Sequence, residues 1–447
     1  MDDVRAPAAT YIVTRGKNRW TCLRLDTVPT SASRFEPLRE GDLGIPMSAS
    51  TTPPSRRTPR WVTACAVLLF FSAVYATTAN WEESEINADA VAAALPAWSL
   101  AAHGTIDLPA GALVNPWVIE RPDGNFSNRP PGNFLVAVPA YLVAGEPESF
   151  SNAPATATAV LLTAAAMAVL FLTLTSLTSV QAAALAVVVF AFGTATWPIS
   201  SAQLWPHGVG QLAAAVGLFG LATDRYLLGG LGFAGALLVR PPTAIFSAIT
   251  GLWISADAAP RRWRPVLVIG LTSLASLGLL LLYNKVVFGA LGVSGGYSPQ
   301  FAGNLASMPW SDYARNVLAM FVLPRNGLFV WSPVILVALF ASLREWSHAP
   351  AWAKASLIAG LVYLLVHARL NRASGGLAFN YRYPLEPLVL MAPMLTLGAV
   401  AWVRRGGTTR LLVVAGAAVS VLLQALYVFT LTCEPAAPGQ LLCSLGI

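Results

Sequence analysis

The feature that most constrains this chain is a long series of apolar segments that carry almost no charge. The first covers residues 61–79, and the others cover 153–174, 180–198, 204–223, 227–239, 243–256, 265–283, 328–343, 351–368, 384–403 and 410–431. A helix needs roughly 20 apolar residues to cross the hydrocarbon core of a bilayer. We therefore expect an all-α polytopic membrane protein with about eleven transmembrane helices.

Composition excludes the main alternatives to a membrane protein. Of the 447 residues, 55% are hydrophobic and 11% are charged, whereas a soluble domain has about 25% charged residues. This balance excludes both an ordinary soluble enzyme and a disordered chain. The net charge of +7 does not indicate a nucleic-acid partner, because the basic residues lie at the ends of apolar segments and not on one face.

The distribution of polar segments predicts the domain organisation. Residues 1–60 are rich in Pro, Ser, Thr and Arg and predict a mostly disordered cytoplasmic tail. Residues 61–431 form the transmembrane domain, in which 80–152 and 284–327 are the first and second extracytoplasmic loops, and 432–447 form an extracytoplasmic tail. Because basic residues are more frequent at the ends that this arrangement places inside, we expect an integral protein of the cytoplasmic membrane with an extracytoplasmic active site.

The cysteines and short motifs give no evidence of cofactor chemistry. Cys433 and Cys443 lie in the outer tail, where an oxidising compartment permits either a disulfide or two free thiols. The sequence has no dinucleotide-binding glycine motif, Walker loop or HExxH motif. We predict no cofactor and no dedicated metal site; a divalent metal between an acidic cluster and a phosphate stays an open alternative.

Acidic residues follow the first apolar segment closely: Glu82, Glu83, Glu85 and Asp89. An Ala- and Leu-rich stretch continues to His103-Gly104, where the glycine predicts the end of a helix. Carboxylates are favourable at a helix N-terminus, so these acids need no further role. Alternatively, one of them acts as a general base on an acceptor hydroxyl, and the candidates are Asp89, Glu85 and Glu82.

The same loop contains the element Asn128-Arg129-Pro130-Pro131-Gly132, followed by an apolar stretch that ends at Gly145. The Pro-Pro-Gly sequence fixes a turn. The stretch after it is too short to cross a bilayer and predicts an interfacial or re-entrant helix.

Together, the acidic cluster, the helix ending in His103-Gly104-Thr105 and the Arg129-Pro-Pro-Gly element resemble multi-spanning glycosyltransferases of the GT-C superfamily. The similarity is to the protein O-mannosyltransferase and lipid A aminoarabinose transferase type, over roughly residues 61–260. In that family the Pro-Pro element usually follows a lysine, and Arg129 keeps this charge. The spacing to His-Gly-Thr brings Asp89 closest to the family's acidic position.

The resemblance implies a GT-C-like fold with interfacial helices in a large first loop. It also implies transfer of a hexose or pentose from a polyprenyl-phosphate donor in the membrane to a glycan, lipid or protein acceptor. The leaving lipid phosphate develops negative charge, which positioned cations stabilise.

Polar residues near the outer ends of the spans are therefore the candidates for binding the donor. They are Arg129, His207, Arg240, Arg325, Arg372, Tyr381 and Arg382. A single outer arginine also has a simpler role, because long cationic side chains commonly reach lipid headgroups. The tyrosines near these arginines either line the membrane interface or stack on a sugar.

Two other functions stay open. A transporter or flippase of a lipid-linked intermediate is one, although the sequence has no convincing internal repeat of the kind many transporters show. A non-catalytic membrane scaffold that retains the fold is the other.

Overall fold

The computed structural model describes residues 10–16, 19–25, 59–82, 87–145, 149–257, 263–293, 295, 298–371, 380–437 and 440–445. The chain divides into two compact units, Met1–Arg57 and Thr58–Ile447. This division falls close to residue 60, where the sequence predicts the end of the polar tail.

The first unit contains a hairpin that the sequence analysis did not predict. Strand β1 (Thr10–Gly16) pairs with β2 (Arg19–Leu25) in antiparallel register, with Thr10 opposite Leu25. The segment is rich in β-branched and aromatic residues, which favour strands, but the surrounding Pro- and Ser-rich sequence masked this local pattern. The rest of the predicted disordered tail lies outside the described residues.

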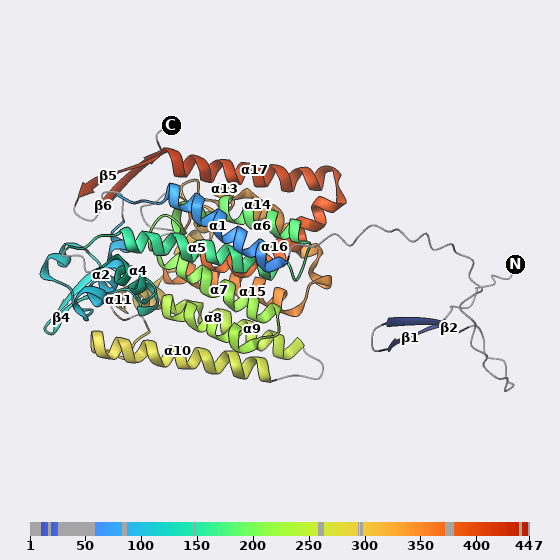
Figure 1. Cartoon of the computed structure of the whole chain (residues 1–447), viewed down its shortest axis with the longest axis horizontal. Helices are drawn as coiled ribbons and strands as arrows, with labels where there is room; N and C mark the ends of the chain where they lie inside the picture. The colour runs from blue at the N-terminus through green and yellow to red at the C-terminus, as the bar shows by residue number, and fades with distance from the viewer. Residues whose placement is uncertain are drawn as a thin grey trace. The chain divides into compact units, whose positions relative to one another are not determined.

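The second unit is a bundle of helices, and each predicted apolar segment contains one. They are α1 (Arg60–Thr78), α5 (Ala153–Leu174), α6 (Val180–Phe192), α7 (Pro206–Ala222), α8 (Tyr226–Val239), α9 (Ala244–Asp257), α10 (Arg264–Phe288), α13 (Leu328–Trp331) with α14 (Pro333–Arg344), α15 (Ala351–Leu370), α16 (Leu385–Arg405) and α17 (Gly407–Thr430). Most of the long ones run side by side along one direction (Figure 1). The chain is an all-α polytopic membrane protein, as predicted.

Six of these helices are long and apolar enough to cross a membrane, namely α1, α5, α10, α15, α16 and α17. Others are shorter, such as α6 and α8. The break between α8 and α9 contains Arg240 and the 3₁₀ turn η4 (Pro241–Thr243), because consecutive prolines cannot continue a helix interior. The predicted number of eleven spans therefore stays a prediction.

The predicted outer loops lie at one end of the long helices. The first contains α2 (Ala88–His103), η2 (Ala110–Val114), β3 (Val118–Arg121), β4 (Gly124–Ser127), α3 (Pro131–Leu135) and α4 (Val138–Ala144); the second contains α11 (Ser298–Ser307) and α12 (Trp310–Val322). Figure 1 shows α2, α4, β4 and α11 at this end, on the left, together with β5 (Leu431–Ala437) and β6 (Gln440–Leu445). Cys433 and Cys443 are paired in the backbone register of these last two strands; their disulfide stays a prediction.

The first loop has an apolar core of its own. Trp98 of α2, Phe134 of α3 and Tyr141 of α4 are buried in it, and Val239 at the end of α8 joins them. As predicted, α2 ends at Gly104, whose φ of 70° is left-handed backbone that glycine adopts without a side-chain clash. The loop is therefore a packed platform at the end of the bundle.

The packing of α7 against α8 depends on glycines. A Cβ atom added at Gly220 would overlap the backbone of Gly229, so the two helices approach through bare backbone. We expect Gly220→Ala to lower the free energy of unfolding by about 1–3 kcal/mol, because the backbones must separate. Gly270 of α10 is the control, since its Cβ would meet open space and alanine there is expected to be neutral or stabilising. Thermal unfolding in detergent tests this, and equal midpoints for the two variants would contradict it.

Candidate active site

Asp89 is the best-defined acidic residue of the predicted site. It lies in the first turn of α2, where the side chain of Asn87 caps the helix by accepting a hydrogen bond from the Asp89 backbone at 2.9 Å. The backbone of Asn87 donates in turn to Gln203 Oε1 at 2.8 Å, which ties the start of α2 to the segment before α7. Only 7% of Asp89 is exposed. A buried carboxylate is therefore held at a fixed place beside the bundle.

Two arginines pair with this carboxylate. Arg129 Nη2 donates to Asp89 Oδ1, and Arg382 Nη1 donates to Asp89 Oδ2 at 2.7 Å. Each guanidinium also lies over an aromatic ring: Arg129 is 5.0 Å from the ring centre of Trp117, and Arg382 is 4.7 Å from that of Trp205. Charge-assisted bonds and aromatic stacking together fix the planes of both guanidiniums.

The electrostatics keep Asp89 ionised. Burial by itself raises the pKa of Asp89, but the charges and hydrogen bonds of Arg129 and Arg382 outweigh burial and hold this pKa below its ordinary value. The pKa of Arg382 is raised, because its interactions with Tyr383 and Asp89 outweigh the effect of burial. The three groups form a charged cluster with one more positive than negative charge. Such a cluster attracts an anion.

The lowered pKa of Asp89 predicts a pH dependence of stability. An unfolded aspartate has a pKa of about 3.9, so the pairing stabilises the folded protein fully above this value and is lost as the pH falls through the lower folded pKa. We expect the difference in unfolding midpoint between the wild type and Asp89→Asn to be constant between about pH 5 and 7 and to shrink below about pH 4. Thermal unfolding over this range measures it. A difference that already shrinks between pH 7 and 5 would mean that Asp89 titrates near neutrality.

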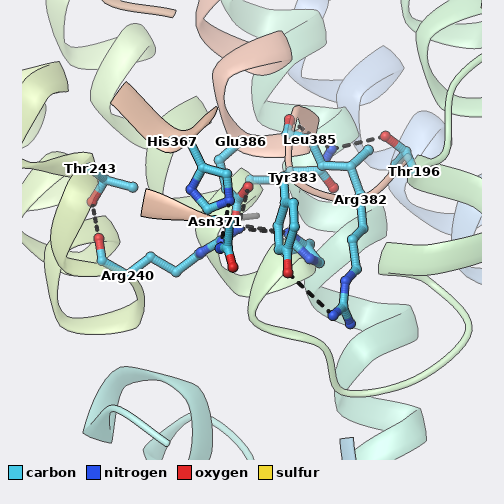
Figure 2. Close-up of polar contacts among 11 residues, drawn as sticks. Thr196, Arg240, Thr243, His367, Asn371, Arg382, Tyr383, Leu385 and Glu386 are labelled. Carbon is cyan, nitrogen blue, oxygen red and sulfur yellow. Dashed lines mark hydrogen bonds and ion pairs between the residues drawn. The ribbon is translucent and has the colours of Figure 1, made fainter. Parts of the chain in front are cut away.

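A second charged cluster lies close to the first. Glu386 in the first turn of α16 is fully buried, and Arg240 Nη1 donates to both of its carboxylate oxygens, at 3.0 and 3.2 Å. His207 Nδ1 lies 3.1 Å from Glu386 Oε1. Figure 2 shows Tyr383 between Arg382 on one side and the Glu386 and His367 side chains on the other. The Tyr383 ring therefore lies between the two clusters.

The structure unites four of the predicted donor-binding residues in these two clusters: Arg129 and Arg382 in the first, His207 and Arg240 in the second. Glu82, predicted as an alternative base, is exposed to solvent. Arg325 is also exposed; its backbone carbonyl accepts a hydrogen bond from Asn380 at 2.8 Å. Glu85 and Arg372 lie outside the described residues.

The prediction for Tyr381 needs correction. Its side chain is fully buried, and its hydroxyl is hydrogen-bonded to Ser332 at 2.6 Å and to the backbone nitrogen of Ala195 at 3.2 Å. The ring therefore packs between helices and is not open to a sugar. Tyr383, two residues further, is the tyrosine that contacts the charged groups.

Glu386 and His367 were not among the predicted site residues, and Tyr383 was predicted only as a ring that lines the membrane interface or stacks on a sugar. A signal for Glu386 did exist, because an acidic residue at the start of an otherwise apolar span is costly and such residues tend to be functional. Among the described residues no group of three or more His, Cys, Asp or Glu side chains is placed to hold a metal. The expectation of a site without a metal stays a prediction.

No protein-family model and no curated protein matches the chain. Among solved structures, the chain is similar to ArnT from Cupriavidus metallidurans in the apo state, with 13% identity and a TM-score of 0.46 over 77% of this chain and 61% of that one. The same enzyme bound to undecaprenyl phosphate gives 13% identity and a TM-score of 0.46 over 82% and 75% of the two chains.

The chain thus spans about three fifths of the length of the first of these structures. ArnT is the lipid A aminoarabinose transferase.

Proposed function

We propose that the protein is a membrane glycosyltransferase that moves a sugar from a polyprenyl-phosphate donor to a hydroxyl acceptor on the extracytoplasmic side. The observation that carries this proposal is the meeting of Asp89, Arg129 and Arg382 at the loop end of the bundle. A carboxylate and two guanidiniums are the groups that a base-assisted transfer with a phosphate leaving group needs.

The arginines bind the phosphate of the donor. Arg382 has a buried Nε that finds no hydrogen-bond partner among the described residues. An unpaired buried donor is costly, and a phosphate oxygen satisfies it well. Arg382 lies on a loop next to the start of α16, a helix long and apolar enough to cross a membrane, and we place the lipid phosphate of the donor at this end of that helix.

Asp89 is the base that takes the proton of the acceptor hydroxyl. Each of its oxygens accepts one bond from a guanidinium and keeps a further lone pair for the acceptor hydroxyl. The acceptor hydroxyl gives its proton to Asp89 as the hydroxyl oxygen bonds to the anomeric carbon. The bond between that carbon and the phosphate oxygen breaks, and polyprenyl phosphate leaves with the electron pair.

The purified protein in detergent tests the reaction. A radiolabelled polyprenyl-phosphate sugar is offered together with cell-envelope fractions that contain glycan, lipid and protein acceptors. The proposal expects label in one acceptor fraction and release of polyprenyl phosphate. A second assay uses the protein reconstituted in liposomes. Movement of intact donor across them without transfer would favour a flippase, and neither transfer nor movement would favour a scaffold.

Orientation is tested separately in whole cells. Single cysteines are placed in the first loop, at the exposed Gly111, and beyond α9, at the exposed Asp257. We expect a membrane-impermeant thiol reagent to label residue 111 only. Labelling of residue 257 but not 111 would place the site in the cytosol and contradict the proposal.

A further inference from the structure

The second cluster contains a buried, closely packed ion pair between Glu386 and Arg240. Glu386 is fully buried, and its partner Arg240 has only 14% of its side chain exposed. A Cβ atom at Gly210 of α7 would lie 2.7 Å from Glu386 Cγ, so only glycine allows α7 to pass this close. Ion pairs buried this way bring little stability, because the cost of removing two charges from water offsets their attraction. A role other than stability is therefore expected for this pair.

Tyr383 connects this pair to the first cluster. Its ring centre lies 5.4 Å from the Arg240 guanidinium and 5.2 Å from that of Arg382. Arg382 Nη2 donates to the Tyr383 hydroxyl at 3.5 Å, and the His367 ring lies 4.3 Å from the ring of Tyr383. Figure 2 shows this ring upright beside Arg382. The Tyr383 ring therefore contacts His367 and Arg240 as well as Arg382.

The backbone reinforces this connection. Arg382, Tyr383 and Glu386 lie within five residues of one another, and the turn before α16 is closed by a hydrogen bond from Leu385 N to the Arg382 carbonyl at 3.2 Å. The bonds of Glu386 to Arg240 therefore hold the first turn of α16 in place. That turn sets the direction in which the Arg382 side chain leaves the backbone.

We propose that Glu386 is a positioning residue: through Arg240 and Tyr383 it fixes the Arg382 guanidinium against Asp89, and it does not itself contact the donor. This inference rests on the proposed function. If Arg382 is misplaced, stabilisation of the leaving phosphate falls more than ground-state binding does, since the charge on that oxygen develops only in the transition state.

The test compares Glu386→Gln with Tyr383→Leu, which removes the connecting ring and leaves the buried ion pair intact. Both are expected to lower kcat per folded molecule at least tenfold while the donor KM changes less than threefold. The double variant is expected to lose no more than the worse single variant, because both act along one path. Glu386→Asp, which keeps the charge, is expected to recover part of the rate. Asp257→Asn, exposed at the end of α9, is the control.

Two results would overturn the proposal: a kcat per folded molecule of Glu386→Gln within twofold of the wild type, or losses that multiply in the double variant. A purely structural role would lower the unfolding midpoint and leave kcat per folded molecule unchanged.

If the wild type transfers no sugar, the proposed function fails, and thermal unfolding alone decides the positioning claim. Glu386→Gln and Arg382→Lys are then expected to shift the midpoint non-additively; additive shifts would overturn the claim.

Discussion

Replacement of Asp89 by asparagine is expected to lower the transfer rate by about 10²- to 10⁴-fold, the usual contribution of a positioned general base. Asparagine has the size of aspartate but no charge and no basic oxygen. It therefore removes the proton acceptor and also leaves two buried guanidiniums facing each other. Initial rates with a labelled donor measure the loss, and the donor KM is expected to change far less than kcat because the arginines are still present.

The matched control is Asp123→Asn in the same loop. Asp123 has 58% of its side chain exposed and makes a surface pair with Arg121 at 3.4 Å, and exposed pairs contribute little. We expect its rate to stay within twofold of the wild type. Breaking a buried pair costs about 3–5 kcal/mol of stability, so rates are expressed per folded molecule. An Asp89→Asn variant with more than a tenth of the wild-type rate would remove Asp89 as the base.

Much of the fold is predictable from the sequence because hydropathy is a local property. Each apolar run contains a helix, and the apolar stretch after the Arg129 element, for which one short helix was predicted, forms the two short helices α3 and α4. The β1–β2 hairpin was missed because two short strands give a weak signal in a Pro- and Ser-rich segment. What the sequence cannot give is how many of the shorter helices cross the bilayer, since this depends on their depth and tilt.

Some residues of the candidate site are predictable from the sequence, but the way they pair is not. Asp89 and Arg382 were both named from charge and position, yet 293 residues separate them, and only the packed bundle brings them together. The choice between Tyr381 and Tyr383 depends on the local backbone. Asn380 adopts a φ of 70°, a left-handed conformation uncommon outside glycine, and it directs the residues that follow. Composition gives no information about such a turn.

Replacement of Arg382 by lysine is expected to lower kcat/KM for the donor by about 10²- to 10³-fold, the usual effect of removing one positioned charge donor. The charge is kept, so the loss comes from geometry. The guanidinium of Arg382 donates to Asp89 Oδ2 through Nη1 and to Tyr383 through Nη2, and its plane lies over Trp205. A lysine ammonium is a point charge that cannot make these contacts and still offer a second donor to phosphate.

Arg315→Lys provides the control for this variant, because Arg315 has 77% of its side chain exposed and pairs with Asp312 on the surface of α12. We expect its kcat/KM for the donor to stay within twofold of the wild-type value. Donor titrations separate two explanations of the Arg382→Lys loss: a rise in KM alone indicates that Arg382 only binds the donor, whereas a fall in kcat indicates that it stabilises the leaving phosphate. If Arg382→Lys keeps the wild-type kcat and KM, other cations bind the donor phosphate. Arg129, on the opposite side of the same carboxylate, would be the first of these to test.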